Sequence, residues 1–172
     1  MTLLKTIIFT VVAPGTITVY LPHVLLSSPT APPPLPIGLL RSLGFIPLVL
    51  GAAIYFRCAW DFAFAGRGTP APIDPPKELV VRGLYRYVRN PMYVGVLTVL
   101  LGEVLSFASI GLLAYAGVVF LGFHLFVVFY EEPALQRKFG ESYQRYCESV
   151  PRWRARMRMN GNGKSSCNSG RD

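Results

Sequence analysis

The residues best suited to chemistry lie in two short polar segments, one on each side of a long apolar run. In the first, residues 82–93, arginines alternate with tyrosines and lead directly into Asn90-Pro91. Asn is a favoured N-cap and Pro is well tolerated at the first helical position, so a helix is expected to begin here. The free N–H groups and partial positive charge of a helix start attract carboxylates and phosphates. The segment therefore predicts an anion-attracting pocket lined by aromatic side chains.

The second polar segment is the acidic pair Glu131-Glu132, which ends the apolar run. Carboxylates beside a helix N-terminus would together suit a zwitterionic ligand, one that carries both a carboxylate and an ammonium group. The alternative is that the acids simply cap a membrane span and that Arg82, Arg86 and Arg89 are interfacial anchors. The residues alone leave both interpretations open.

The apolar run must bring the two segments together. Residues 91–130 contain no Lys or Arg and one acid, Glu103, over about twice the ~20 residues that a spanning helix needs. A turn is expected at residues 106–111, which gives a helical hairpin with adjacent ends. A carboxylate within a span is costly, so Glu103 is either functional or paired with a neighbour. Five glycines are expected to allow close helix approach: Gly95, Gly102, Gly111, Gly117 and Gly122.

Composition indicates a membrane protein. The chain is 52% hydrophobic and 15% charged, with a mean hydropathy of +0.41, and its apolar residues come in blocks. Of its 17 Lys and Arg residues, five lie between residues 64 and 90 and nine lie after residue 133. This places the net charge of +8 on one membrane face, with anionic headgroups, and not nucleic acid, as the expected bulk partner. That face is expected to be cytoplasmic. The three cysteines lack metal-binding spacing, so no metal site is predicted.

The predicted fold class is all-α, a multi-pass integral membrane helical bundle of about four spans. Residues 1–64 are expected to hold two N-terminal spans, the first with a kink at Pro14 and an end near residue 21. Arg57 and Asp61, four residues apart in the second span, are expected to pair. The hairpin supplies the last two spans, and one amphipathic helix is predicted over residues 133–149. Residues 154–172 are predicted to form a basic, disordered tail.

Two segments, LVVRGLYRYVRNPMYVGV and EEPALQRKFGESYQRYCESVPRW, resemble the paired motifs of the isoprenylcysteine carboxyl methyltransferase and phospholipid methyltransferase superfamily. The resemblance covers about residues 77–153, with the two motifs about 40 residues apart, as in that family. It implies that residues 65–153 form a methyltransferase core. It also implies an S-adenosylmethionine site that faces the cytoplasm, in a bacterial inner membrane or the endoplasmic reticulum. A lipophilic acceptor would enter that site from the bilayer.

Carried over by position, the resemblance also implies a set of site residues. The helix start at Asn90 would take the methionine carboxylate and Glu131 the ammonium group, while Tyr85 and Tyr93 would offer aromatic faces. Glu132 and Arg89 are the candidate catalytic residues, with Glu132 a conceivable base for an amine acceptor. The implied cofactor-binding residues are Lys77, Glu78, Leu79, Val80, Tyr85, Asn90, Pro91, Met92, Tyr93 and Glu131.

The chain departs from the family pattern at two positions. Asn90 stands where the motif usually has His, and Val127 stands where the isoprenylcysteine enzymes have an arginine four residues before the matching Glu. The activity most like the pattern is isoprenylcysteine O-methylation. The alternatives are a phospholipid N-methyltransferase, an NADPH-dependent membrane reductase of the sterol type and a non-enzymatic membrane scaffold. The oligomeric state is left open.

Overall fold

The computed structural model describes residues 12–29, 34, 36, 38–65, 79 and 81–154. Within these residues every regular element is a helix, as the all-α prediction requires. The elements in chain order are η1 (Thr16–Tyr20), α2 (Leu21–Ser27), α3 (Leu40–Leu43), α4 (Phe45–Ala65), η2 (Gly83–Arg86), α5 (Pro91–Phe107), α6 (Ile110–Phe126), η3 (Val127–Glu131), α7 (Glu132–Phe139) and α8 (Glu141–Ser149). Of the three η elements, η1 and η3 are π-helical and η2 is a 3₁₀ turn.

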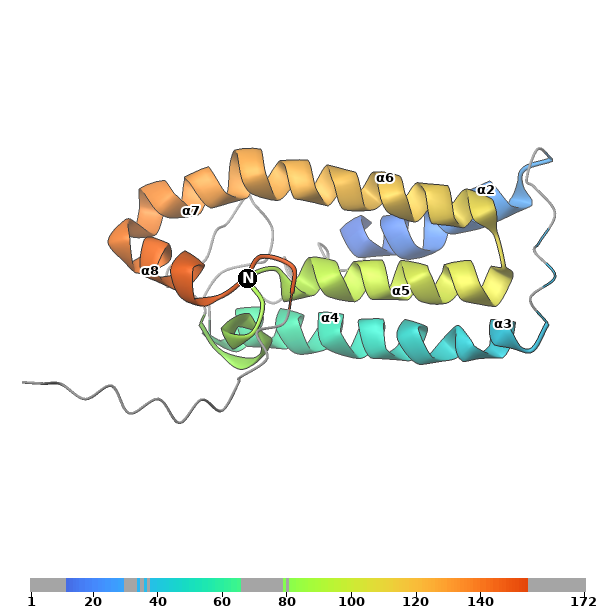
Figure 1. The fold of residues 1–172 in the computed structure, drawn as a ribbon, viewed down its shortest axis with the longest axis horizontal. Helices are drawn as coiled ribbons and strands as arrows, with labels where there is room; N and C mark the ends of the chain where they lie inside the picture. The colour runs from blue at the N-terminus through green and yellow to red at the C-terminus, as the bar shows by residue number, and fades with distance from the viewer. Residues whose placement is uncertain are drawn as a thin grey trace, which may run out of the picture.

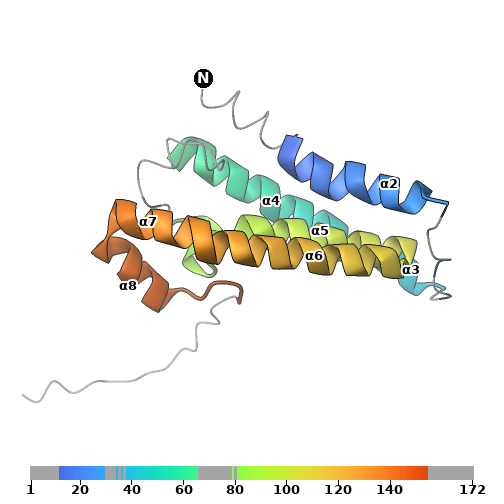
Figure 2. The ribbon, with the colours of Figure 1, turned by 90° about the horizontal axis from the view of Figure 1, so that it is seen from above.

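The central element is α5, which packs against α3, α4, α6 and η1 (Figures 1 and 2). The elements α6, η3 and α7 follow one another without a break and form one long helical rod along the bundle. At the end of this rod α8 folds back toward the start of α5. The topology thus brings the start of α5 and the region around residue 131 to the same end of the molecule.

The predicted hairpin is confirmed. Its turn consists of Ala108, in the left-handed region at φ 53°, and Ser109. The Ser109 hydroxyl accepts a hydrogen bond from the backbone N–H of Leu112 at 3.3 Å, which caps the start of α6. The arms therefore end and begin within two residues of each other.

Glycines bring α4 and α5 into close contact, as predicted for Gly95 and Gly102. A Cβ atom added to Gly51 of α4 would lie 2.6 Å from the Gly95 carbonyl oxygen, and one added to Gly102 would lie 2.6 Å from the Leu48 nitrogen. The backbones of the two helices are therefore too close for any side chain at these positions. The prediction was wrong for Gly117 and Gly122, because a Cβ atom added to either glycine would meet no atom of another helix within 4 Å among the described residues.

Two segments are long and apolar enough to cross a membrane, Arg41–Asp61 and Ile110–Phe139. Two shorter apolar helices, Val12–Ser27 and Pro91–Phe107, lie beside them. In Ile110–Phe139 the most apolar stretch has a mean hydropathy of 2.3, yet only 17% of it is buried within the protein. A helix that is apolar on its outer face is typical of a protein surrounded by lipid. The fold is that of a helical membrane protein.

Two helix boundaries differ from the prediction. The first helix continues to Ser27, past the expected end near residue 21, and a π-helical stretch follows Pro14. The expected single helix over residues 133–149 is two helices, because Gly140 adopts a φ of 54° between them.

The predicted pair within α4 is confirmed, with Arg57 Nη1 2.8 Å from Asp61 Oδ1. Residues 155–172 of the predicted tail lie outside the described residues.

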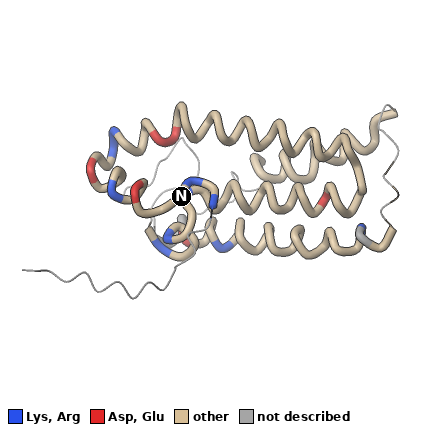
Figure 3. Tube along the Cα trace, in the orientation of Figure 1, with Lys and Arg blue, Asp and Glu red and all other residues tan. Residues whose placement is uncertain are grey.

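The charged residues gather at one end of the bundle, where η2, α7 and α8 meet (Figure 3). At the opposite end the described residues carry two charges, Arg41 and Glu103. The polar end contains both sequence motifs, and the candidate functional site lies there.

Candidate functional site

The two sequence motifs meet through Tyr93 and Glu131. The Tyr93 hydroxyl donates a hydrogen bond of 2.9 Å to Glu131 Oε2 across 38 positions of sequence. Tyr93 lies in the first turn of α5, and Glu131 ends η3. The hairpin brings them together because its two arms run back along each other and place both ends at one side of the bundle.

A cavity of about 100 Å³ lies against this pair. Its polar side is formed by six of the residues predicted from the sequence, and its remaining wall is largely apolar. The predicted residues are Tyr85, Arg89, Asn90, Met92, Tyr93 and Glu131, and the others are Ala13, Pro14, Ile17, Tyr55, Val96 and Phe123. Both motifs therefore contribute to one cavity.

Asn90 begins α5 as predicted, but its side chain does not cap the helix. Its Nδ2 donates instead to the carbonyl oxygen of Arg152 at 3.3 Å, and Asn90 is 7% exposed. The amide side chain thus connects the helix start to the C-terminal segment. The sequence predicted the position of the helix start correctly and the partner of its side chain wrongly.

Tyr85 is held in the site by η2 and by the C-terminal helix. The Tyr146 hydroxyl of α8 donates a 2.7 Å hydrogen bond to the Tyr85 carbonyl oxygen. Burial raises the pKa of the Tyr85 phenol well above its ordinary value, so it stays neutral. The Tyr93 ring, which also lines the cavity, lies 4.7 Å from the Phe123 ring, centroid to centroid. The site therefore offers neutral aromatic surfaces beside a carboxyl group.

Glu132, the second acid of the pair, belongs to a separate ionic cluster. Its Oε1 lies 3.0 Å from Arg89 Nη1 and 2.7 Å from Arg152 Nε, and its Oε2 accepts from Arg152 Nη2 at 2.8 Å. The two-point bond to Glu132 raises the pKa of the Arg152 guanidinium. The Glu132 side chain does not line the cavity.

The C-terminal segment 150–154 crosses the site through three further contacts. The Arg89 backbone N–H donates to the Pro151 carbonyl at 3.0 Å, and the Trp153 indole N–H donates to His124 Nδ1 at 3.2 Å. The Trp153 ring also lies 6.5 Å from the Tyr93 ring. Arg152, Trp153 and Phe123 were not predicted as site residues, although the first two are part of the second motif and could have been included on that ground.

Two of the predicted cofactor-binding residues that the structure describes, Leu79 and Pro91, do not line the cavity. Pro91 is fully buried at the first position of α5. Leu79 packs against a cluster formed by Tyr143, Tyr146 and Val150. Lys77, Glu78 and Val80 lie outside the described residues, so the assignment of residues 77, 78 and 80 stays a prediction. The roles of Arg89 and Glu132 in catalysis likewise stay predictions.

A family model for phospholipid methyltransferases matches residues 40–142, more than half of the chain. The chain belongs to this family. The matched residues run from α3 to the start of α8, and they include both Tyr93 and Glu131. As a member of the phospholipid methyltransferase family, the protein is placed among membrane methyltransferases. Enzymes of this family typically use S-adenosylmethionine.

The fold is also similar to a solved structure, that of a eukaryotic intramembrane Ras methyltransferase, isoprenylcysteine carboxyl methyltransferase. The TM-score is 0.53 and the sequence identity 21%, over 67% of this chain. The chain spans 42% of the length of that protein. No curated protein matches in sequence comparison. The similarity in structure therefore concerns the helical fold that this phospholipid methyltransferase family member shares with that enzyme.

Proposed function

We propose that the protein is an S-adenosylmethionine-dependent membrane methyltransferase that transfers a methyl group to a lipophilic acceptor. The observation that carries the proposal is the bond between Tyr93 and Glu131, 2.9 Å long. It joins the two family motifs at one cavity. The membership of the chain in the phospholipid methyltransferase family supports the same activity.

The residues around the cavity fit the amino-acid end of this cofactor. The Glu131 carboxyl group accepts a hydrogen bond only from a neutral phenol in the contacts described, and it would hold the ammonium group. Arg89 Nε is buried without a hydrogen-bond partner, and Arg89 lines the cavity. An unsatisfied guanidinium N–H in a buried position would donate a hydrogen bond to a carboxylate oxygen of the ligand.

The size of the cavity limits what it can take. At about 100 Å³ it is smaller than the roughly 300–1,000 Å³ of most small-molecule sites. We therefore assign it to the amino-acid and sulfonium end, between the faces of Tyr85 and Tyr93. The strip at residues 77–80, just before η2, is proposed to cover the nucleoside.

When bound, the cofactor would supply a methyl group on a sulfonium that is already an activated leaving group. The protein would hold the acceptor in line with it and keep water out, and positioning of this kind contributes up to about 7–11 kcal/mol. A carboxylate acceptor has no proton to lose, whereas a primary amine releases one on methylation. Glu132 is engaged by two arginines in this structure, so we assign it to positioning Arg89 and the C-terminal segment.

The acceptor is proposed to arrive from the bilayer through the apolar wall of the cavity, which includes Ile17 and Phe123. In this proposal all four apolar helices cross the membrane, with the charged end, α7 and α8 on the cytoplasmic side. Isoprenylcysteine carboxylate is the first candidate acceptor. The family match favours a second, the amine of a phospholipid headgroup.

Thermal unfolding of the purified protein in detergent would test the cofactor. S-adenosylhomocysteine should raise the midpoint, because a ligand that binds only the folded state stabilises it, and NADPH should not. Stabilisation by NADPH alone would point to a reductase, and stabilisation by neither would contradict the proposal. Transfer of a radiolabelled methyl group into a lipid extract, beside a prenylcysteine analogue, would then identify the acceptor.

A further inference from the structure

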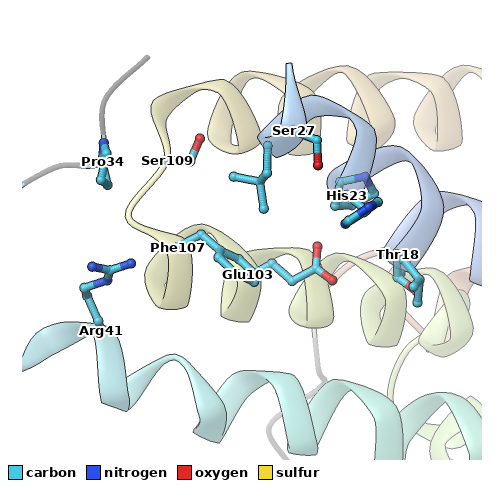
Figure 4. Close-up of a pocket in the computed structure, with 11 residues that line it drawn as sticks. Thr18, His23, Ser27, Pro34, Arg41, Glu103, Phe107 and Ser109 are labelled. Atoms are coloured by element: carbon cyan, nitrogen blue, oxygen red, sulfur yellow. The ribbon is translucent and has the colours of Figure 1, made fainter. Parts of the chain in front are cut away.

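A second cavity lies at the opposite end of the bundle from Tyr93 and Glu131 (Figure 4). It has a volume of about 550 Å³ and lies among α2, the start of α3 and the turn between α5 and α6. None of its lining residues lines the first cavity. Glu103 follows Tyr93 by ten positions on α5, which is about 15 Å along a helix. This cavity is therefore a separate space.

Glu103 is the acidic residue of this cavity. It is 9% exposed, and its Oε2 is buried without a hydrogen-bond partner. Figure 4 shows its carboxyl group directed away from α5 toward His23 of α2 and Thr18 of η1. A carboxyl oxygen buried in an apolar bundle without a hydrogen-bond donor destabilises the folded state, unless a bound ligand supplies the donor. A ligand with an N–H donor inside the cavity would therefore stabilise the Glu103 carboxyl group.

Arg41 is the basic residue of the same cavity and stands at its rim (Figure 4). Its Nε donates to the Ser106 carbonyl oxygen at 3.1 Å, which fixes the guanidinium beside the hairpin turn. Arg41 is exposed, so the guanidinium remains open to an anion. Arg41 and Glu103 are the two charged residues of this end of the described chain, and both line one cavity.

Apolar residues complete the lining, among them Val19, Leu26 and Phe107. Val19 is 67% exposed on η1, directly before α2, in a helix of a membrane protein. The cavity therefore joins a buried acid, a rim cation and an apolar surface that faces lipid. A ligand that matches all three carries an ammonium group, an anionic group close to it and hydrocarbon chains.

We propose that this cavity binds the headgroup of an aminophospholipid from the leaflet opposite the methyltransferase site. The primary ammonium of the lipid donates to Glu103, its phosphodiester pairs with Arg41, and its acyl chains lie along α2 and Phe107. A quaternary ammonium has no N–H to give to Glu103. An anionic lipid without an amine leaves Glu103 unsatisfied.

The test measures thermal unfolding of the full chain in detergent with phosphatidylethanolamine, phosphatidylcholine or phosphatidylglycerol at equal mole fraction. Phosphatidylethanolamine should raise the midpoint most. Glu103→Gln keeps the size of the side chain but removes its charge, and it should weaken this lipid by about tenfold to a hundredfold. Arg41→Gln should weaken it too. Glu148→Gln, an exposed acid on α8, is the matched control and should behave like the wild type.

Equal stabilisation by all three lipids, or an unchanged response in Glu103→Gln, would overturn the proposal. Folding of the variant is checked by its helix content and by a single peak in gel filtration. Soluble glycerophosphoethanolamine distinguishes a free headgroup from a lipid. If it stabilises the wild type as strongly as the lipid does, the acyl chains have no part and the lipid assignment fails. The response to S-adenosylhomocysteine is measured in parallel, so failure of the cofactor site and failure of this site are told apart.

Discussion

Glu131 and Glu132 are neighbours in the sequence, yet their carboxyl groups belong to two separate networks. Glu131 accepts from Tyr93 at the cavity, while Glu132 pairs with Arg89 and Arg152. Glu131 ends the π-helical turn η3 and Glu132 begins α7. A π-helical turn takes an extra residue and changes the direction of the side chains that follow, and such turns are frequent at functional sites. One acid is thereby available to a ligand and the other secures the surrounding structure.

Replacing Glu131 by Gln should remove the proposed ammonium partner without changing the volume of the side chain. The affinity for S-adenosylhomocysteine is expected to fall by about tenfold to a hundredfold, because hydrogen bonds to charged groups contribute about 1.5–3 kcal/mol. Isothermal titration in detergent measures it. Glu141→Gln, an exposed acid at the start of α8, is the matched control. Wild-type affinity in Glu131→Gln would remove this residue from the site.

Tyr93 is expected to contribute through both its ring and its hydroxyl. Tyr93→Phe keeps the ring contact with Phe123 and should lose only the bond to Glu131, about 1 kcal/mol or fivefold in affinity. Tyr93→Ala removes the ring as well and should abolish measurable cofactor binding while the protein stays folded. If the Phe and Ala variants bound equally well, the ring would have no part in the site.

The cluster of Glu132 with Arg89 and Arg152 should contribute to stability more than to binding. Glu132→Gln is expected to lower the free energy of unfolding by about 1.5–3 kcal/mol, since two partly buried arginines lose their charged partner. A double-mutant cycle with Arg152→Gln, measured by denaturant unfolding, isolates the pair. A coupling energy near zero would show that the C-terminal segment is held by its other contacts.

The glycine contact between α4 and α5 gives a matched pair of substitutions. Gly51→Val should destabilise the protein by about 1–3 kcal/mol or more, because the new side chain meets the backbone of α5. Gly117→Val should have little effect, because a Cβ atom added at this position of α6 would meet no described atom of another helix within 4 Å. Thermal midpoints of the two variants in the same detergent compare them. Equal midpoints would mean that α4 and α5 are farther apart in solution than in this structure.

Stability should fall at alkaline pH because of buried tyrosines. Burial raises the pKa of Tyr146 above its ordinary value of 10.0 in the folded state. Below pH 10 both states are protonated and no pH dependence arises from this residue. Above pH 10 the unfolded chain loses the proton first, so unfolding becomes more favourable until the folded pKa is passed.

Unfolding measured from about pH 8 to about pH 11 would test this tyrosine effect. Tyr146→Phe should be less stable than the wild type near neutral pH, because the bond to the Tyr85 carbonyl is lost. Above pH 10 its stability should decline less steeply than that of the wild type. An identical decline in both proteins would assign the effect to other groups, such as Tyr85 and Tyr143, whose pKa values burial also raises.

Local signals in the sequence predicted the features that depend on nearby residues. Asn90-Pro91 marked the start of α5, and the apolar run with its turn near residue 108 marked the hairpin. The spacing of Arg57 and Asp61 predicted their pair. Each of these follows from helix geometry over a few residues, so no knowledge of distant contacts was needed.

Hydropathy, the helix-start signal and the two motifs were enough to predict a helical membrane protein of the methyltransferase type, with its polar chemistry at the two ends of one hairpin. The positions of the side chains in the folded chain were needed to show that Glu132 lies outside the cavity, that Asn90 bonds the C-terminal segment, and that Arg41 and Glu103 line a second space. The reason is that hydropathy and helix signals depend on residues close together in the sequence, whereas the hydrogen-bond partner of a side chain is often distant in the sequence. That choice depends on the rotation of each helix about its axis, which here is set by a π-helical turn and by the glycine contact of α4 with α5.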